Sequence, residues 1–210
     1  MDPERTIDTY DRLAGKYAAR PVYPLEREIA RFADLVGGRR RVIDAGCGAG
    51  QYARKLAARG LGVVALDRSA GMLAQAAAAG TPRLLQADMG RLPLPAAACE
   101  GCFACASLLH IPRAQAPAAL AEFRRVLRPG GVLYLSLKLG SGEEWVASGG
   151  MGERFFVYYR PAEIDHRLAE AGFQVVDGWL GPPGPDGRHS WLNRFARVGG
   201  KRSRTDAKTP

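Results

Sequence analysis

The segment at residues 42–50, with the sequence VIDAGCGAG, constrains the fold more than any other part of this chain of 210 residues. Its first four residues have the mostly apolar character of a short buried strand, and a helical stretch follows the last glycine. Glycine allows the backbone to adopt positive φ angles and to approach a ligand closely. The segment therefore predicts a strand, a tight turn at a ligand site and a helix, in that order.

The remainder of the chain alternates strand-like and helix-like segments, which is typical of a parallel sheet with helices on both faces. Hydrophobic spacing and terminal glycines or prolines set the expected boundaries. The predicted helices are residues 7–20, 25–36, 51–59, 70–79, 117–127 and 161–171, and the predicted strands are residues 41–45, 61–66, 83–86, 99–106, 132–138, 173–179 and 190–198. We therefore predict an α/β, Rossmann-like sheet of seven strands.

The last two predicted strands determine one feature of the topology. They are joined by the turn sequence GPPGP at residues 181–185, with no helix between them. Strands joined in this way are antiparallel neighbours, because a parallel pair needs a long crossover connection. We expect a parallel sheet with an antiparallel terminal hairpin in a single domain at residues 1–198, followed by a polar, disordered tail at residues 199–210.

The net charge of +9 invites comparison with nucleic-acid-binding proteins. The tail has four basic residues against one acidic residue, so it supplies +3, and the domain shows no basic run interleaved with aromatic residues. No apolar stretch reaches the ~20 residues that span a bilayer, and the first residues do not resemble a secretory signal. We therefore expect a cytoplasmic protein with mostly solvated basic residues and no membrane partner.

Three cysteines, Cys99, Cys102 and Cys105, have the C-x2-C-x2-C spacing that is familiar from zinc and iron–sulfur sites. Here they lie in a predicted strand, where successive side chains point to opposite faces. Cys102 is expected to point away from Cys99 and Cys105, and Cys47 lies in a different loop. Buried cysteines commonly act as small apolar residues, so we expect no metal site.

Two aspartates follow the second and third predicted strands at nearly equal spacing. Asp67 comes about 20 residues after Gly46, where a carboxylate can accept hydrogen bonds from both hydroxyls of a ribose. Asp88 follows the third strand and can accept from the amino group of an adenine, with Met89 against the ring. Each aspartate alone could be a helix cap or a turn residue. Together with the glycine turn, they predict one adenosine-binding site at the carboxyl ends of the strands.

A dinucleotide and S-adenosylmethionine (SAM) are the two ligands that such a turn binds. A dinucleotide fingerprint has the pattern G-x-G-x-x-G, whose last glycine allows close packing of helix and strand. This chain has G-x-G-x-G, with its third glycine at Gly50 and with Gln51 in the dinucleotide position. The pattern with its neighbouring aspartates favours SAM, and a nicotinamide-dependent dehydrogenase is the alternative.

Five segments together resemble the successive motifs of the class I SAM-dependent methyltransferases, in particular the broad type 11/type 25 group. They are DAGCGAG at 44–50, ALDRS at 65–69, ADM at 87–89, SLLHIP at 107–112 and LRPGGVL at 127–133. The resemblance covers nearly the whole chain from residue 10 to residue 198 and includes the antiparallel last strand of that fold. It implies an enzyme that uses SAM, and it leaves the methyl acceptor open.

The resemblance also implies roles for single positions. Asp44 and the glycine turn would face the methionine part of SAM, Asp67 the ribose and Asp88 the adenine, while Cys105 and Ala106 would lie beneath the sulfonium. The full set of implied cofactor-binding positions is Tyr17, Arg20, Asp44, Gly46, Cys47, Gly48, Gly50, Asp67, Arg68, Met72, Asp88, Met89, Cys105 and Ala106.

The N-terminal region at residues 1–36 is expected to form lid helices. Residues 10–20 are similar to the N-terminal lid of the wobble-uridine tRNA methyltransferases, in which an aromatic residue and an arginine close over the cofactor. Tyr17 and Arg20 would have these roles here, because a guanidinium suits a carboxylate partner. An ordinary amphipathic helix with exposed charges is the alternative.

The methyl acceptor is the part of the function that the sequence constrains least. His110 follows the fourth strand at the rim where an acceptor arrives, so it is a candidate general base or substrate contact, with a turn-capping histidine as the alternative. Residues 139–160 contain Trp145 and the aromatic run FFVYY, which could cover a substrate or pack on the sheet edge.

We predict transfer of a methyl group to an oxygen or nitrogen atom of a small molecule. The alternatives are an RNA or tRNA methyltransferase, which the basic composition favours, and a SAM-binding protein without catalytic activity. The sequence leaves the oligomeric state open.

Overall fold

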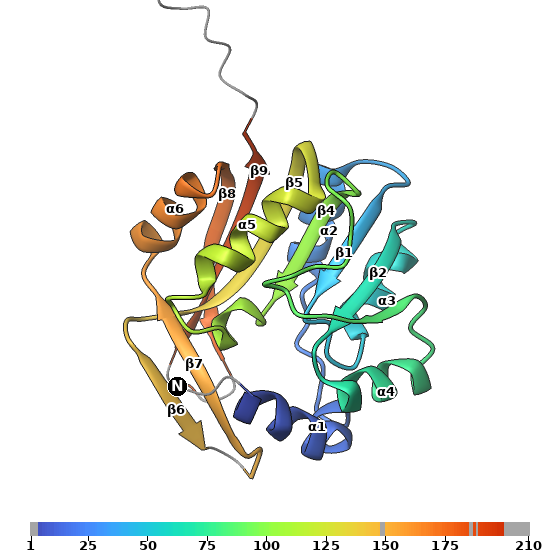
Figure 1. Ribbon diagram of the computed structural model, residues 1–210, viewed down its shortest axis with the longest axis vertical. Coiled ribbons are helices and arrows are strands. Elements are labelled where there is room, and N and C mark those ends of the chain that lie inside the picture. Colours follow the sequence, from blue (N-terminus) through green and yellow to red (C-terminus); the bar gives the residue numbers. More distant parts are fainter. Residues whose placement is uncertain (1–3, 148–149, 185–186, 188, 200–210) are drawn as a thin grey trace, which may run out of the picture.

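The computed structural model describes residues 4–147, 150–184, 187 and 189–199. Within these residues, one sheet of nine strands forms the centre, with helices on both faces and across one end (Figure 1). The strands are β1 (Arg41–Ala45), β2 (Gly62–Asp67), β3 (Leu84–Gln86), β4 (Cys99–Cys105), β5 (Leu127–Leu139), β6 (Glu143–Ala147), β7 (Glu153–Tyr159), β8 (Phe173–Pro183) and β9 (Ser190–Val198). The helices are α1 (Glu4–Ala18), α2 (Glu26–Val36), α3 (Gln51–Ala58), α4 (Ala70–Ala78), the 3-10 helix η1 (Leu108–His110), α5 (Ala116–Val126) and α6 (Pro161–Glu170).

The strand order explains why several loops meet at one edge. Strands β3, β2, β1, β4 and β5 are parallel neighbours in that order, so their carboxyl ends lie along the same rim. On its other edge, β5 pairs with the antiparallel β9. Beyond the last residue that pairs with β4, Lys138 and Leu139 of β5 pair with the parallel β7, and since Lys138 also pairs with β9, these two strands lie on opposite edges of β5. Strand β8 pairs with β9 in an antiparallel manner. The predicted α/β, Rossmann-like class with an antiparallel terminal hairpin is confirmed.

Strands β6 and β7 are additional to the seven predicted strands. They form an antiparallel pair whose register runs from Glu143↔Val157 to Ala147↔Glu153. Glycine and serine residues before β7 suggested an irregular connection, but the aromatic run in β7 itself favours a strand. All of β7 after its first residue is buried. Residues 143–147 and 153–159 are therefore part of the sheet.

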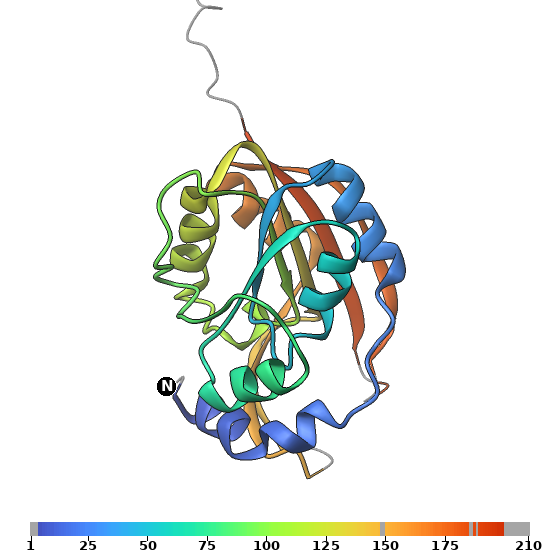
Figure 2. The ribbon, with the colours of Figure 1, turned by 90° about the vertical axis from the view of Figure 1, so that its right-hand side faces the viewer.

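The hydrophobic core has two layers, one on each face of the sheet. Along β5, Leu133, Leu135 and Leu137 pack toward α5 and α6, and Tyr134 packs toward α2 and α3. This alternation follows from the two-residue period of a strand. Figure 2 shows α5 and α2 on opposite sides of the sheet. The core thus fixes β5, and with it the strand ends that border the site.

Some boundaries differ from the predicted ones. Helix α1 begins at Glu4 and ends at Ala18, so that Arg20 lies in the connection after it. Strand β5 begins at Leu127 directly after α5, and β8 extends to Pro183. The predicted disordered tail lies outside the described residues except for Gly199. No helix of the described chain has both the length and the apolar character that crossing a bilayer requires.

The cysteines of β4 do not alternate as predicted. Cys99 and Cys102 both belong to the core layer beneath α5, while Cys105 packs on the other side. The pairing of β4 with β5 shifts between Cys99 and Gly101, and such an irregularity changes the face to which the preceding residue points. Cys102 and Cys105 therefore lie on opposite faces of the sheet, as predicted. The prediction that Cys102 and Cys99 also lie on opposite faces was wrong. Among the described residues, no three His, Cys, Asp or Glu side chains are grouped to hold a metal ion.

Candidate functional site

A cavity of about 690 Å³ lies at the carboxyl ends of the parallel strands. The turns after β1, β2, β3 and β4 form one side of it, and α1, β7 and the end of β5 form the other. Helix α1 crosses this end of the sheet, between α4 and the β6–β7 pair (Figure 1). The parallel order of the strands therefore places the predicted cofactor turn and the lid segment around one space.

The glycine turn after β1 is shaped by close approach of the backbone. Gly46 has a φ of 78°, and a Cβ atom placed on it would lie 2.3 Å from Cβ of Ser107. The amides of Gly46 and Cys47 both donate to the carbonyl of Leu66 on the neighbouring strand. No other residue type fits at Gly46 without displacing the Ser107 turn. The turn thus presents bare backbone to the cavity.

Asp67 lies at the end of β2, and two backbone amides fix the position of its carboxylate in the cavity. Its Oδ2 accepts from the amide of Gly48 at 2.8 Å, and its Oδ1 accepts from the amide of Ser69 at 2.9 Å. Burial raises the pKa of this carboxyl, and the backbone amides oppose that rise. The remaining lone pairs of the two oxygens can accept further hydrogen bonds from a ligand. Arg68 and Met72 also line the cavity.

Asp88 lies at the outer part of the same cavity. Its Oδ1 accepts from the amide of Gly90 at 2.7 Å, and its Oδ2 lies 3.4 Å from the guanidinium of Arg68. Met89 also lines the cavity and its methyl group approaches Gly46. Asp67 and Asp88, predicted as a pair from their spacing, are therefore brought to one side of one cavity.

Two predicted cofactor-binding positions, Asp44 and Gly50, do not line the cavity. Asp44 is buried, and its Oδ2 has no hydrogen-bond partner. Burial, together with the charge of Asp67, raises the pKa of the Asp44 carboxyl to about 8. Gly50 adopts the left-handed conformation at the N-terminus of α3, against the side chain of Thr81. These residues shape the turn from below.

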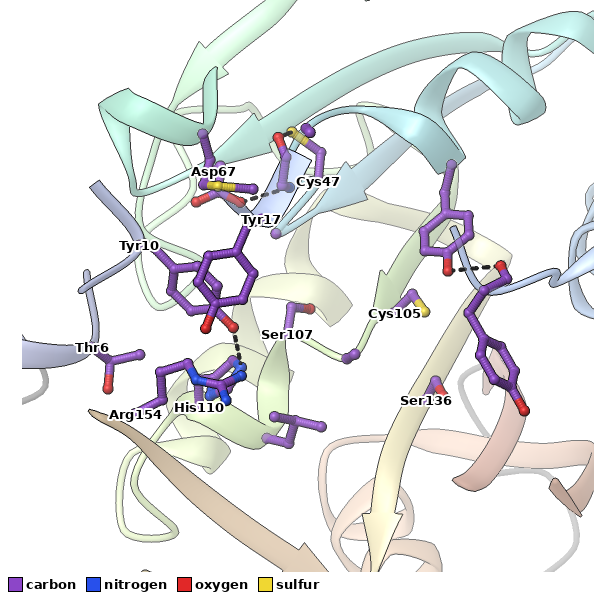
Figure 3. A pocket seen from close by; sticks show the side chains of 18 of the residues that line it. Thr6, Tyr10, Tyr17, Cys47, Asp67, Cys105, Ser107, His110, Ser136 and Arg154 are labelled. Carbon is purple, nitrogen blue, oxygen red and sulfur yellow. Dashed lines mark hydrogen bonds between the residues drawn. The ribbon is translucent and has the colours of Figure 1, made fainter. Parts of the chain in front are cut away.

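The end of β4 forms the floor of the cavity. Cys47, Cys105 and Ala106 all line it, and Figure 3 shows Cys105 near Ser136 at the end of β5. Burial raises the pKa of the Cys105 thiol, so the thiol is neutral at physiological pH. Ala106 has a φ of 52° in the turn that leads to Ser107. The floor is thus compact and uncharged.

His110 lies in the cavity wall, and both of its ring nitrogens form hydrogen bonds. Nδ1 lies 2.7 Å from the carbonyl oxygen of Phe155, and Nε2 lies 2.8 Å from the hydroxyl of Tyr10 (Figure 3). Burial lowers the pKa of the His110 imidazole to about 4. The ring is therefore neutral at pH 7, and no ring nitrogen is free in this arrangement.

The lid segment contributes more to the cavity than the two predicted residues. Tyr17 and Arg20 both line the cavity, and the Tyr17 hydroxyl donates to the carbonyl of Met151 at 2.9 Å. Tyr10, which the sequence reasoning did not select, faces both Tyr17 and His110, with ring centroids 4.7 and 5.5 Å away. Tyr10 precedes Tyr17 by seven residues, or two helical turns, so the sequence could have indicated that both side chains lie on the same face of the helix.

Helix α1 is held at both sides. Asp11 accepts hydrogen bonds from the hydroxyl of Ser69 and the amide of Gly71 at the start of α4. Thr9 donates to the carbonyl of Glu153 at 2.9 Å, at the beginning of β7. The helix thus bridges α4 and β7 above the cavity, which is the position of a lid.

Two further residues of the wall, Arg154 and Lys138, were not predicted, whereas Phe156 belongs to the aromatic run that was expected to cover a substrate or to pack on the sheet edge. Arg154 and Phe156 on β7 and Lys138 on β5 line the cavity. The guanidinium of Arg154 lies 5.0 Å from the centre of the Phe156 ring, and Nζ of Lys138 lies 4.8 Å from the same centre. The sequence placed none of these contacts, because they depend on β7 lying beside β5.

Comparisons with known proteins show that the chain is similar to methyltransferases. Residues 43–135 match the family model described as a methyltransferase domain. The malonyl-[acyl-carrier protein] O-methyltransferase of Serratia marcescens is 36% identical over 149 residues, which are 69% of this chain and 57% of that protein. The protein of the same name in Enterobacter lignolyticus is 37% identical over 135 residues, or 63% of this chain and 53% of the relative. The chain thus spans about half the length of the curated relatives it matches.

A solved structure shows the same fold. The 1,6-didemethyltoxoflavin-N1-methyltransferase of Burkholderia thailandensis, determined with bound 1,6-didemethyltoxoflavin and S-adenosylhomocysteine, superimposes with a TM-score of 0.74. The two sequences are 22% identical, and the match covers 95% of this chain and 92% of the other. At this identity the likeness concerns the fold.

Proposed function

We propose that the chain is a class I SAM-dependent methyltransferase that transfers a methyl group to an oxygen atom of a small-molecule acceptor. The observation that carries the proposal is the single cavity that joins the Asp67 and Asp88 side to the His110 and Phe156 side. One side has the groups that suit an adenosyl ligand, and the other has an aromatic wall beyond the end of β4. When bound, SAM supplies a methyl group on a positively charged sulfur.

The residues present fit this cofactor. The carboxylate of Asp67 would accept from the ribose hydroxyls, and Asp88 would accept from the adenine amino group. The backbone of Gly46 and Gly48 would lie against the methionine part, where a Cβ atom on either residue would approach Ser107 or Met72 within 3.3 Å. Arg20 offers a guanidinium for the methionine carboxylate.

The remaining predicted cofactor positions divide into two groups. Tyr17, Cys47, Arg68, Met72, Met89, Cys105 and Ala106 line the cavity and would contact the cofactor directly. Asp44 and Gly50 would act from behind, by fixing the turn.

The roof over the cavity supports a small acceptor. Helix α1 and the β6–β7 pair close the side opposite the strand ends, and Val146, Met151 and Phe156 line the cavity from that segment. A space of this size suits a metabolite or the end of a carried acyl group. We propose that residues 139–160 cover the acceptor. The RNA alternative has the basic composition in its favour, and part of that charge lies beyond the described residues.

Oxygen is favoured as the methylated atom by the relatives. The names of the Serratia and Enterobacter proteins describe O-methylation of a malonyl group on an acyl carrier protein. Transfer to an ionised oxygen needs no proton removal, which agrees with a His110 ring that has no free nitrogen. We therefore assign His110 to shaping the acceptor wall together with Tyr10.

Calorimetric titration tests the cofactor part of the proposal. SAM and S-adenosylhomocysteine should bind with micromolar dissociation constants, and NADH and NADPH, as controls, should not. Transfer is then measured with methyl-tritiated SAM on malonyl-pantetheine, related acyl thioesters and bulk tRNA. Label in the thioesters supports the proposal. Binding of a nicotinamide cofactor instead, or label confined to tRNA, would contradict it.

A further inference from the structure

The side chain of Arg154 is a buried cation that faces the cavity without a carboxylate partner. The residue is 8% exposed, and its Nε has no hydrogen-bond partner. Among the described residues, no Asp or Glu forms an ion pair with it. A guanidinium removed from water in this way is costly unless an anion compensates it. The arrangement indicates a binding site for an anion.

The carboxylates that line the cavity interact with groups other than Arg154. Asp67 accepts from the amides of Gly48 and Ser69, and Glu28 accepts from the indole of Trp179 at 2.9 Å. Asp88 faces Arg68 and the amide of Gly90. None of them forms an ion pair with Arg154 in the structure, so the place of a counter-anion is open to a ligand.

The contacts of the Arg154 guanidinium are with aromatic side chains. Its guanidinium lies 5.4 Å from the centre of the Tyr17 ring and 5.0 Å from that of Phe156. Its charge lowers the pKa of the Tyr10 hydroxyl, against a larger rise from burial. Lys138 approaches Phe156 as well, at 4.8 Å. The chamber around Phe156 is thus positively charged and shielded from water, where a charge-assisted hydrogen bond is strong.

We infer that Arg154 binds a carboxylate of the methyl acceptor, so that the enzyme methylates carboxylic acids. The inference rests on the proposed function. One carboxylate oxygen would accept from Nε of Arg154, and the other would attack the methyl carbon. A carbon–oxygen bond forms, the carbon–sulfur bond breaks with its electron pair going to sulfur, and a neutral methyl ester leaves. The acceptor is ionised at pH 7, so no proton is transferred.

Three arginines line the cavity, and Arg68 faces Asp88. The positions of the other two, Arg20 and Arg154, favour the acceptor over the carboxylate of SAM as the anion at Arg154. Arg20 is exposed, comes from the connection after α1 and lines the cavity. Arg154 lies beside His110, and in Figure 3 the rings of Tyr10 and Tyr17 lie between Arg154 and Asp67. The guanidinium of Arg154 is therefore on the acceptor side. The loss of charge on methylation also weakens its hold on the product ester.

The first test observes Arg154 directly in the unaltered protein. In 15N spectra of the chain saturated with S-adenosylhomocysteine, the Arg154 Nε–H signal is assigned by its absence in Arg154→Lys. Titration with malonyl-pantetheine should shift this signal in a saturable way. The methyl ester of the same thioester is the matched neutral probe and should leave the signal in place.

The second test uses crossed arginine variants. Arg154→Gln should raise the KM for malonyl-pantetheine at least about tenfold, because a hydrogen bond to a charged group is lost. Its dissociation constant for S-adenosylhomocysteine should change less than about twofold. Arg154→Lys should restore part of the loss, and Arg20→Gln should instead weaken S-adenosylhomocysteine. Arg31→Gln, whose ion pair with Asp177 lies outside the cavity, is the control for removal of an arginine.

Three results would overturn the inference. If S-adenosylhomocysteine binds and neither thioester shifts the Nε–H signal, Arg154 holds no acceptor carboxylate, while the proposed function stands. If S-adenosylhomocysteine alone shifts the signal and Arg154→Gln weakens its binding, the anion is that of the cofactor. If S-adenosylhomocysteine does not bind at all, the proposed function fails and the inference fails with it.

Discussion

The hydroxyl of Tyr10 on α1 lies 2.8 Å from Nε2 of His110 on η1, two residues that are 100 positions apart in the sequence. Nδ1 of the same imidazole faces the carbonyl oxygen of Phe155 at 2.7 Å. A carbonyl oxygen only accepts, so Nδ1 carries the proton and Nε2 accepts from Tyr10. The ring thereby joins the lid helix to β7, and the acceptor wall is complete only when α1 is in place.

Removal of the Tyr10 hydroxyl should loosen the lid. In Tyr10→Phe, Nε2 of His110 becomes a buried acceptor without a donor, so the free energy of unfolding should fall by about 1–3 kcal/mol. Urea unfolding at pH 7 measures the change. In a His110→Phe background the same substitution should cost clearly less. An equal cost in both backgrounds would show that the two side chains are not coupled.

The Asp67 carboxylate should dominate the affinity for the cofactor. Asp67→Asn keeps the size of the side chain but removes the charge and one acceptor, so the dissociation constant of S-adenosylhomocysteine should rise at least about tenfold. Calorimetry measures this change. Asp177→Asn, which alters an aspartate paired with Arg31 away from the cavity, is the matched control. Unchanged binding in Asp67→Asn would remove the ribose role from Asp67.

Gly46 in the glycine turn can be compared with Gly60, which follows α3 and also has a positive φ angle. Gly46 and Gly60 have φ angles of 78° and 84°, so an alanine at either residue pays a similar backbone cost of about 1 kcal/mol. A Cβ atom at Gly46 would lie 2.3 Å from Ser107, whereas at Gly60 it meets nothing within 4 Å. Gly46→Ala should therefore lower the melting temperature more than Gly60→Ala, and it alone should abolish binding of S-adenosylhomocysteine. Equal effects of the two substitutions would argue against a tight turn at the cavity.

Stability should depend on pH through His110. The pKa of the folded imidazole is about 4, and that of an unfolded histidine is about 6.5. Between these values the unfolded chain binds a proton that the folded chain does not, so the free energy of unfolding falls as the pH decreases. The difference amounts to about 3 kcal/mol and stays constant below pH 4.

Urea unfolding between pH 4 and pH 7 isolates this contribution. His110→Gln lacks the titrating ring, so its stability should decrease less over the range than that of the unaltered chain. Carboxylates elsewhere in the molecule contribute to both curves and cancel in the comparison. Two parallel curves would mean that His110 is protonated in the folded state or exposed to water.

The sequence by itself determined seven of the nine strands and the placement of the glycine turn, Asp67 and Asp88 around one cavity. Buried parallel strands have a continuous apolar pattern, and their carboxyl ends meet at one rim, so Asp67 and Asp88 could be assigned to one site from spacing alone. The glycine turn could be placed for the same reason. These features depend on contacts between neighbouring segments and on the regular period of a strand.

The tertiary structure alone decided the acceptor side. Arg154, Phe156 and Lys138 come together because β7 pairs with the end of β5, a long-range pairing that no local pattern specifies. The irregularity of β4 at Cys99 likewise follows from its pairing with β5. A hydrophobic period tells which face of a strand is buried, but it does not tell which strand will lie beside it.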